Sequence, residues 1–294
     1  MTGRDKIRRA MYFGAAVFVL CPILMLSLCW MQPARSAGFI ICATLLVFFL
    51  VISRWDIVGY WLQYIFLAAL LILAWHRGGW LLFGFSVLFL LAIELFFRQS
   101  GRSAPLELSF PLSAGTYYVA HGGSFKILNH HRGSKSQSCA LDIVQLNGFG
   151  MRAAGIYPQR LQNYKIFGDV VLSPCAGTVT SVLDELPNLP LGEMDRKNVT
   201  GNHIVIRSDD SEVYVGLAHL MQGSILVKVG DRVTVGQALA CVGNSGNTSE
   251  PHLHIHAKRG GRLESMLDGE GVPMRFGGRW LIRNSIVRKR KGPG

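Results

Sequence analysis

Three histidines near the C-terminal end, His252, His254 and His256, alternate with Leu253 and Ile255. Successive side chains of a β-strand point to opposite faces, so a strand here presents three imidazoles on one side and two aliphatic groups on the other. Imidazole is the commonest metal ligand and the side chain that titrates near neutral pH. The segment therefore predicts a metal or acid–base site on one strand face, with a solvated polar face as the simpler alternative.

Two further residues are candidates for metal ligands, because a catalytic zinc usually has three protein ligands and one open position. His131 precedes a polar loop, and Asp142 lies between Leu141 and Ile143 in an expected strand. There the acid points away from the face that its apolar neighbours bury, and it needs a partner such as a metal. Taken alone, a turn-capping aspartate and a surface histidine pair, His130 and His131, would explain both features.

His219 ends another expected strand, in the segment Tyr-Val-Gly-Leu-Ala-His-Leu. By itself it is a structural histidine bonded to a turn. Beside a strand that carries alternating histidines it becomes a candidate catalytic group. Eight of the nine histidines lie beyond residue 100, which raises the odds of a metal site there.

The elements that must position these residues are short segments rich in valine and isoleucine and bounded by Gly, Pro, Asn and Asp. No helical period of useful length appears among them, so we predict an all-β domain with a glycine-rich antiparallel sheet. Residues 186–200, with two prolines and mixed charge, are expected to form a surface loop. The expected strands are residues 116–120, 140–146, 170–172, 177–183, 203–207, 212–217, 238–242 and 252–257.

The first third of the chain has a different composition, since it is almost uncharged between residues 11 and 97. A helix needs about 20 apolar residues to cross a bilayer. Tryptophans at the segment ends suit the membrane interface, and a soluble helical bundle would show a polar stripe. We predict four transmembrane helices, at residues 11–31, 37–53, 57–75 and 80–97.

Four regions follow from this contrast: a membrane domain at 1–100, a linker at 101–111, the β-domain at 112–280 and a basic tail at 281–294. With four spans, the basic N-terminus, Arg54, Arg98 and Arg102 share one side of the membrane. The positive-inside rule then places the β-domain in the cytoplasm. The tail could touch anionic lipid, although a solvated terminus is the default.

The six cysteines form no CxxC pair, so buried free thiols are expected rather than a disulfide framework. The net charge of +12 is the one feature that points to nucleic acid. It lies mostly near the membrane helices and the tail, and no nucleic-acid-reading motif accompanies it, so we expect no such partner.

The order of these motifs resembles the lysostaphin-type, or LytM-like, zinc endopeptidases over roughly residues 116–257. The resemblance implies an all-β fold related to the barrel-sandwich hybrid. The block that carries most of it runs from Gly-Asn-Ser-Gly to His-Leu-His. The matching segments are His131, Asp142, Ala-His-Leu at 218–220, Gly-Asp-Arg-Val-Thr-Val-Gly-Gln at 230–237, Gly-Asn-Ser-Gly at 243–246 and Pro-His-Leu-His at 251–254.

Carried over residue by residue, the resemblance implies one zinc ion bound by His131, Asp142 and His254, with His219 and His252 assisting catalysis. The family commonly has three residues between its first histidine ligand and the aspartate, whereas ten separate His131 from Asp142 here. His130 therefore stays open as the first ligand, and His256 is unassigned.

The implied function is that of a membrane-anchored zinc metalloendopeptidase acting on peptide bonds in peptidoglycan. Zinc lowers the pKa of bound water from about 15.7 towards about 7 and polarises the scissile carbonyl. One of His219 and His252 could take the water proton while the other donates to the developing oxyanion. A wall hydrolase must face outward, so we expect an extracytoplasmic domain despite the charge count.

Two non-catalytic alternatives remain. The segments at 173–179 and 229–239 also resemble the hairpins of biotinyl- and lipoyl-type adaptor modules, but no lysine stands at a hairpin tip between small or methionine residues. A metal-free scaffold or activator would have lost ligands, and here a full candidate set is present.

Overall fold

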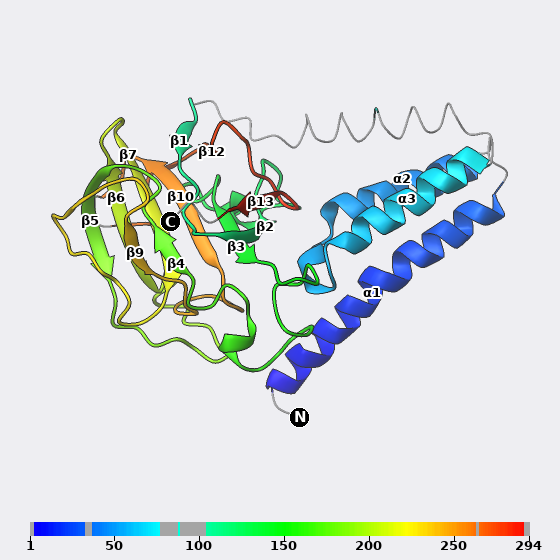
Figure 1. The fold of residues 1–294 in the computed structure, drawn as a ribbon, viewed down its shortest axis with the longest axis horizontal. Coiled ribbons are helices and arrows are strands. Elements are labelled where there is room, and N and C mark those ends of the chain that lie inside the picture. The colour runs from blue at the N-terminus through cyan, green and yellow to red at the C-terminus, as the bar shows by residue number, and fades with distance from the viewer. Residues whose placement is uncertain (1–2, 33–36, 77–87, 89–103, 263–264, 291–294) are drawn as a thin grey trace. The chain divides into compact units, whose positions relative to one another are not determined.

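The structure, a computed structural model, describes residues 3–32, 37–76, 88, 104–262 and 265–290. It divides into two compact units (Figure 1). The helical unit comprises residues 1–97 with the short segments 148–151 and 155–157, and the β-unit comprises the remaining residues.

The helical unit contains α1 (Gly3–Met31), α2 (Ala37–Ile52), the 3-10 turn η1 (Trp55–Ile57) and α3 (Trp61–His76). Trp55 is fully buried, and its ring lies 6.0–6.4 Å from the rings of Phe18, Phe49 and Phe66. The indole nitrogen donates to the carbonyl of Leu50 at 2.8 Å. The turn after α2 is therefore packed inside this unit, whereas a tryptophan between two predicted spans was expected at a membrane interface.

Only one described helix has the length and hydropathy to cross a membrane, the segment Arg8–Met31 of α1. Helices α2 and α3 have 16 residues each, below the roughly 20 that a bilayer requires. The predicted span 57–75 is wrong at its start, because Gly59 at φ 121° separates η1 from α3. The span at 80–97 lies outside the described residues apart from Leu88. The multi-pass prediction is therefore not supported, and α1 is a candidate signal anchor or transmembrane span.

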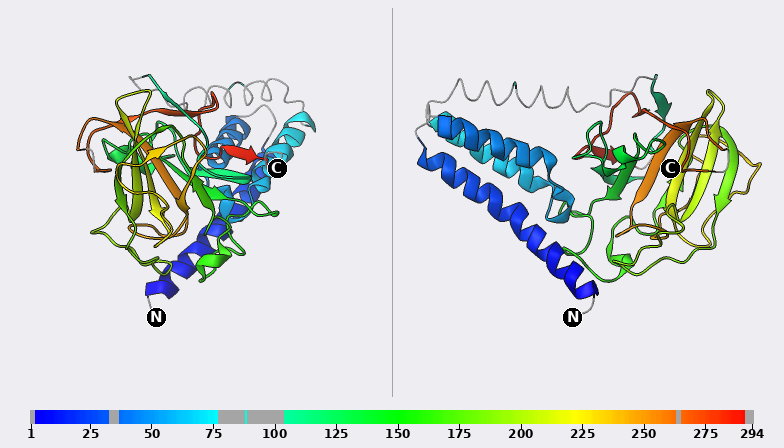
Figure 2. Two further views of the ribbon diagram at one scale, coloured as in Figure 1. Left: turned by 60° about the vertical axis from the view of Figure 1, so that its left-hand side comes forward. Right: turned by 180° about the vertical axis from the view of Figure 1, so that it is seen from behind.

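The β-unit is built on a nine-stranded sheet in the order β13-β2-β3-β10-β7-β6-β5-β8, with β11 paired to β10 (Figures 1 and 2). Two small sheets, β4-β9 and β1-β12, accompany it. The larger strands are β2 (Gly115–His121), β3 (Leu141–Gln145), β5 (Gly177–Leu183), β6 (Asn202–Ser208), β7 (Val213–Leu220) and β10 (Leu253–Arg259). The shorter strands are β1 (Leu106–Leu108), β4 (Val170–Leu172), β8 (Arg232–Val233), β9 (Ala238–Cys241), β11 (Glu270–Val272), β12 (Met274–Phe276) and β13 (Ile286–Lys289).

All eight expected strands are present, and every pair in the nine-stranded sheet is antiparallel. Strands β1, β8, β11, β12 and β13 were not predicted. The first lies in the segment expected to be a linker, and β13 lies in the expected basic tail, where it pairs with β2. No described strand interrupts residues 186–200, which form a loop as expected.

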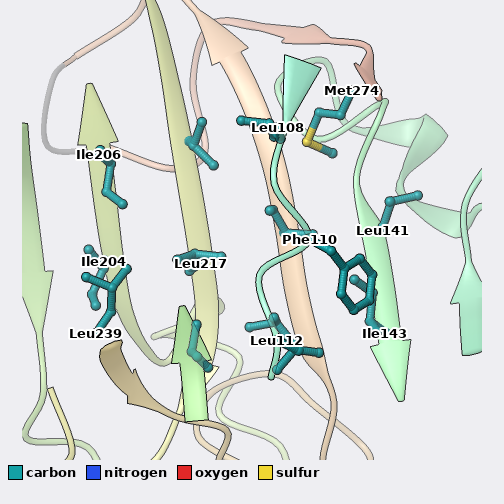
Figure 3. Close-up of a cluster of buried hydrophobic side chains, with 14 of the residues drawn as sticks. Leu108, Phe110, Leu112, Leu141, Ile143, Ile204, Ile206, Leu217, Leu239 and Met274 are labelled. Carbon is teal, nitrogen blue, oxygen red and sulfur yellow. The ribbon is translucent and has the colours of Figure 1, made fainter. Parts of the chain in front are cut away.

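The core covers one face of the large sheet (Figure 3). Strands β3, β6, β7 and β10 contribute alternate side chains, and the segment from Leu108 to Leu112 crosses over them with Phe110 between. Leu253, Ile255 and Ala257 of β10 belong to this core and are fully buried. The other alternate set of β10, beginning at His254, therefore points to the opposite face of the sheet.

Candidate metal centre and active site

The candidate ligands Asp142 and His254 face each other across neighbouring strands. In the antiparallel pair of β3 and β10, His254 is directly opposite Asp142, and Ile143 is opposite Leu253. Leu141 and Ile143 belong to the apolar core. Asp142 is therefore forced onto the same face as His254, where directly opposed side chains on a sheet are in contact. The alternation read from the sequence predicted this placement.

His131 reaches the same carboxylate from a 3-10 turn, η2 (His130–Gly133). Asn129 caps this turn by accepting from the main-chain N–H of His131 at 3.2 Å. The amide of the same Asn129 donates to the carbonyls of Gly123 and Ala140, at 3.3 and 3.1 Å. Asn129 is fully buried. It therefore ties the histidine turn to the residue before β3, and so closes the ten-residue separation that set this sequence apart from the family pattern.

The resulting cluster has the donor set and spacing of a zinc site. Nε2 of His131 lies 3.0 Å from both oxygens of Asp142, and Nδ1 of His254 lies 3.0 Å from Oδ1. One ligand atom from each of the three residues falls within 4.8 Å of the others. Zinc bonds of about 2.0–2.2 Å in a tetrahedron separate their ligand atoms by about 3.3–3.5 Å. Small side-chain movements would therefore admit the ion.

A second group, His121, His130 and Asp142, meets the same distance criterion. One of its members is poorly suited to a cation, because Nη2 of Arg283 lies 2.8 Å from Nδ1 of His121. A guanidinium at that distance opposes the arrival of a metal ion. The cluster that contains His131 is the better candidate, and the choice of His131 over His130 stays a prediction.

His219 reaches this face through a bulge in β7. Val213, Val215 and Leu217 point into the core, so simple alternation would send His219 there as well. Instead Leu220 is the next core residue. The pairing with β6 shifts at this point, with His203 opposite Ala218 and Asn202 opposite Leu220. His219 is the extra residue, and its φ of 61° is the left-handed value that non-glycine residues rarely adopt.

A turn at residues 243–246 fixes the His219 ring. Nδ1 of His219 lies 2.9 Å from the carbonyl of Ser245, which can only accept, so Nδ1 carries the hydrogen and Nε2 is left free. The hydroxyl of Ser245 donates to the carbonyl of Leu220 at 2.8 Å. The Gly-Asn-Ser-Gly motif that carried the family resemblance is therefore the element that orients His219.

His252 is held in a similar way. Its Nδ1 lies 2.9 Å from the carbonyl of Glu250 and 3.2 Å from the hydroxyl of Thr248. Its Nε2 lies 3.5 Å from Oδ1 of Asp142, and its ring is 4.8 Å from that of His219. The Glu250 carboxylate accepts from Nε and Nη2 of Arg152, each at 2.8 Å, in an almost fully buried ion pair. This pair secures the chain just before the two histidines.

The electrostatics of the cluster centre on the single carboxylate. Burial raises the pKa of Asp142, but the imidazoles of His131 and His252 outweigh burial and hold that pKa well below its usual range. Burial likewise lowers the pKa of His252, and the Asp142 charge reverses the shift, so the pKa of His252 is raised. Burial dominates at His219 and lowers its pKa to about 3, which keeps that ring neutral.

A cavity of about 260 Å³ opens beside the cluster. It is lined by the η2 turn and the loop after it, by the end of the 186–200 loop, and by Ala218, His219, Asn247 and His254. The candidate ligands His131 and His254 and the candidate catalytic residue His219 thus line one cavity.

The comparisons with known proteins cover part of this site. The sequence model of Peptidase family M23 matches residues 164–265. The matched segment includes His219, His252 and His254, and it begins after His131 and Asp142. Residues 164–265 of the β-unit are thus similar to Peptidase family M23, which agrees with the resemblance to the lysostaphin-type enzymes. The family consists of zinc-dependent metallopeptidases and includes inactive members.

Several solved structures are similar to parts of the chain. A zinc-containing peptidase from Vibrio cholerae is 30% identical over 32% of this chain and 24% of its own, with a TM-score of 0.25. A putative peptidase M23 from Pseudomonas aeruginosa is 20% identical over 58% of this chain and 54% of its own, with a TM-score of 0.29. Lysostaphin from Staphylococcus simulans is 22% identical over 39% of this chain and 43% of its own, with a TM-score of 0.23.

This chain thus spans about a quarter of the length of the Vibrio cholerae peptidase and about half of the length of the Pseudomonas aeruginosa peptidase. No curated protein matches the sequence.

All five predicted site residues come together, and their roles remain predictions. Three of those residues are held in place by side chains that were not predicted from the sequence, namely Asn129, Arg152 and Glu250. The role of Asn129 could have been predicted from the sequence, since an asparagine directly before a histidine pair and a polar loop is a typical capping residue. The pairing of Arg152 with Glu250 spans 98 residues and has no local signal.

Proposed function

We propose that the β-unit is a zinc metalloendopeptidase that hydrolyses peptide bonds in peptidoglycan. The observation that carries the proposal is the buried Asp142 carboxylate, which lies between Nε2 of His131 and Nδ1 of His254 beside a cavity that His219 also lines. A carrier or adaptor module has no use for this set of residues.

The residues of the chain divide the chemistry among them. Two imidazoles and one carboxylate would hold the ion and leave one position open. When bound, zinc supplies a Lewis acid and lowers the pKa of a bound water. Because Nδ1 of His219 and Nδ1 of His252 are committed to main-chain carbonyls, Nε2 is the reactive atom of each ring. One Nε2 would accept the proton of the attacking water and return it to the leaving amine, and the other, in an imidazolium ring, would donate to the developing oxyanion.

Metal analysis of the purified full-length chain tests the ligand set. We expect about one zinc per chain in the wild type and loss of zinc in His254→Ala and in Asp142→Ala. The control is His76→Ala, because His76 is an exposed histidine at the end of α3, and it should keep the metal. Stoichiometric zinc in both ligand variants would refute the site.

Digestion of purified peptidoglycan tests the activity. The wild type should release new amino termini, and His252→Ala should lose this activity while its zinc content stays the same. A wild-type protein that binds zinc and releases no amino termini would instead favour the non-catalytic scaffold.

We further propose that the β-unit lies outside the cytoplasm. Four spans would return the chain to the side of its basic N-terminus, but only α1 has the required length among the described helices. If α1 is the one span and keeps Arg4, Lys6, Arg8 and Arg9 inside, the β-unit lies on the other side. This removes the conflict between charge and function. A reporter fused after Gly294 should be active outside the cell, and activity only inside would exclude peptidoglycan as the substrate.

A further inference from the structure

The polar face of β10 continues beyond the candidate ligand His254. His256 and Lys258 follow at alternate positions, and each is only 1% exposed. Neither belongs to the candidate metal cluster or lines the cavity beside it. Two polar side chains buried this deeply need partners, and these partners show what the extended polar face does.

The partners form a chain of hydrogen bonds that ends on the candidate ligand. Nε2 of His256 lies 3.0 Å from the carbonyl of Met266, and Nδ1 of His256 lies 3.0 Å from Nε2 of His254. A carbonyl can only accept, so Nε2 of His256 carries a hydrogen.

One hydrogen lies between Nε2 of His254 and Nδ1 of His256. Two hydrogens there would clash, and without any hydrogen the two nitrogen lone pairs would face each other. Placing it on His256 would create a buried imidazolium two residues from the Lys258 ammonium. It therefore belongs to Nε2 of His254.

This assignment fixes which nitrogen of His254 is free. With the hydrogen on Nε2, the lone pair of a neutral His254 is on Nδ1, the atom that lies 3.0 Å from Oδ1 of Asp142. A lone pair and a carboxylate oxygen at this distance repel each other unless a cation lies between them. The hydrogen bonds on the far side of His254 therefore prepare the near side for a metal ion.

The room for this arrangement is provided by Gly216 on β7, directly opposite His256. A Cβ there would lie 2.5 Å from Cε of Met266 and 3.2 Å from Cε1 of His256. Any larger residue would push against the imidazole and the residue that accepts its hydrogen bond.

The series of hydrogen bonds begins at the carbonyl of Met266, and this carbonyl lies in a segment that Lys258 anchors. The ammonium donates to the carbonyls of Gly260 and Arg262, at 3.3 and 2.8 Å, and to Oδ1 of Asp268 at 3.1 Å. It also lies 5.3 Å from the centre of the Tyr214 ring. Anchoring on both sides of Met266 gives its carbonyl a defined position.

We propose that His256 is a positioning residue, which holds His254 in the tautomer whose Nδ1 is free for the metal and takes its own orientation from the Met266 carbonyl. This inference rests on the proposed zinc site. It assigns a function to the one histidine of the alternating run that the candidate catalytic machinery does not use.

Two substitutions separate this role from simple packing. In His256→Gln, the amide oxygen can accept from His254 and the amide nitrogen can donate to Met266, whereas His256→Leu can do neither. Loss of such an outer partner typically weakens metal binding about 10- to 100-fold. Zinc affinity is measured on the full-length protein with a competing chelator. We expect the Leu variant to show this loss and the Gln variant to keep most of the wild-type affinity. The control His203→Leu removes a histidine of β6 that bonds to the carbonyl of Gly201, and it should bind zinc as the wild type does.

The tautomer itself is measured without any metal. In zinc-free wild-type protein carrying ¹⁵N-labelled histidine, the His254 signals should show a protonated Nε2 and an unprotonated Nδ1. A protonated Nδ1 would overturn the inference, and so would wild-type zinc affinity in His256→Leu. Absence of zinc binding in the wild type would instead refute the proposed function and leave the tautomer result standing. The wild-type spectrum decides the question even if the Leu variant does not fold.

Discussion

Strand β10 buries both of its faces, and the two faces depend on different kinds of interaction. Leu253, Ile255 and Ala257 are fully buried in the apolar core, where they contact other carbon atoms. His254, His256 and Lys258 are at most 3% exposed on the opposite face, where each bonds to a specific atom. Equal burial thus accompanies very different chemistry on neighbouring residues, which are about 3.3 Å apart along the strand.

The contrast shows where a substitution should act. An apolar side chain stabilises the fold by the volume it fills, so its loss costs an amount set by the cavity and leaves the site intact. A buried polar side chain stabilises the fold only while its partner is present, and its loss leaves the partner unsatisfied. Changes on the polar face should therefore alter metal binding or the pH response as well as stability.

The largest loss of stability is expected from breaking the buried ion pair at the start of β10. The Arg152 side chain is fully buried and that of Glu250 is 8% exposed, so Glu250→Gln removes the carboxylate charge that faces a buried cation. Such a change typically costs about 3–5 kcal/mol. Urea denaturation of the zinc-bound protein measures it. The control Asp209→Asn breaks the exposed pair with Arg232 and should leave the midpoint unchanged.

A loss below about 1 kcal/mol in Glu250→Gln would show that this buried polar pair is no more sensitive to substitution than the apolar core. In that case the partner of a buried charge would matter no more than a methyl group in the core.

Truncation on the apolar face should cost slightly less and should not affect the metal. Ile255→Ala removes a fully buried side chain and should lower the free energy of unfolding by about 3 kcal/mol, while Ile255→Val should cost about 1 kcal/mol. Zinc affinity, measured with a competing chelator at a temperature where all variants are folded, should equal that of the wild type. A parallel fall in affinity would contradict the separation of the two faces, because His254 and His256 flank this residue in sequence.

The alternation of side chains made the division of β10 and the outward turn of Asp142 predictable from the sequence, since it depends only on the period of a strand. The placement of His219 was reached through the family resemblance and not through that period, which would have sent its ring into the core. The bulge depends on pairing with Asn202 and His203 of another strand, and one strand read alone contains no trace of it.

The helical unit shows the same limit. Its apolar composition was visible, but the lengths of α2 and α3 depend on the turn around Trp55 and Gly59. That turn is set by the packing of aromatic rings from three helices. Composition predicted helices, and tertiary contacts decided where they end.

The bulge at His219 makes a smaller and more specific prediction. In most strand positions alanine is more stable than glycine by about 0.5–1 kcal/mol. Because His219 has a φ of 61°, an alanine there keeps the strain that a glycine relieves. His219→Gly should therefore be more stable than His219→Ala by about 1 kcal/mol, and both should lose activity to the same extent. Thermal denaturation of the two variants measures the difference. If His219→Ala were the more stable variant, as alanine is at most strand positions, the bulge would be unstrained.

The smallest effect concerns a second carboxyl, Asp169, which contrasts with Asp142. The phenol of Tyr117, a residue of the apolar core, lies 3.3 Å from Oδ2 of Asp169. Burial raises the pKa of Asp169 from 3.8 to about 6, against smaller opposing effects of Tyr117 and Lys165. Imidazoles hold the pKa of Asp142 low, whereas Asp169 has no comparable set of cationic partners among the groups that shift its pKa.

Between about pH 4 and pH 6 the folded protein keeps a proton on Asp169 that the unfolded chain has released, so its stability falls as the pH rises through this window. Above pH 6 the cost is constant. The full linkage for such a shift is about 3 kcal/mol, and solvent screening at this half-buried side chain reduces it to about 1 kcal/mol.

Asp169→Asn removes the ionisation, and its amide oxygen can still accept from Tyr117. The variant should therefore be more stable than the wild type at pH 7.5 and equal to it at pH 4, as measured by urea denaturation at both values. An equal difference at the two pH values would mean that the charge of Asp169 is not the cause, and that the two carboxyls differ in packing rather than in ionisation.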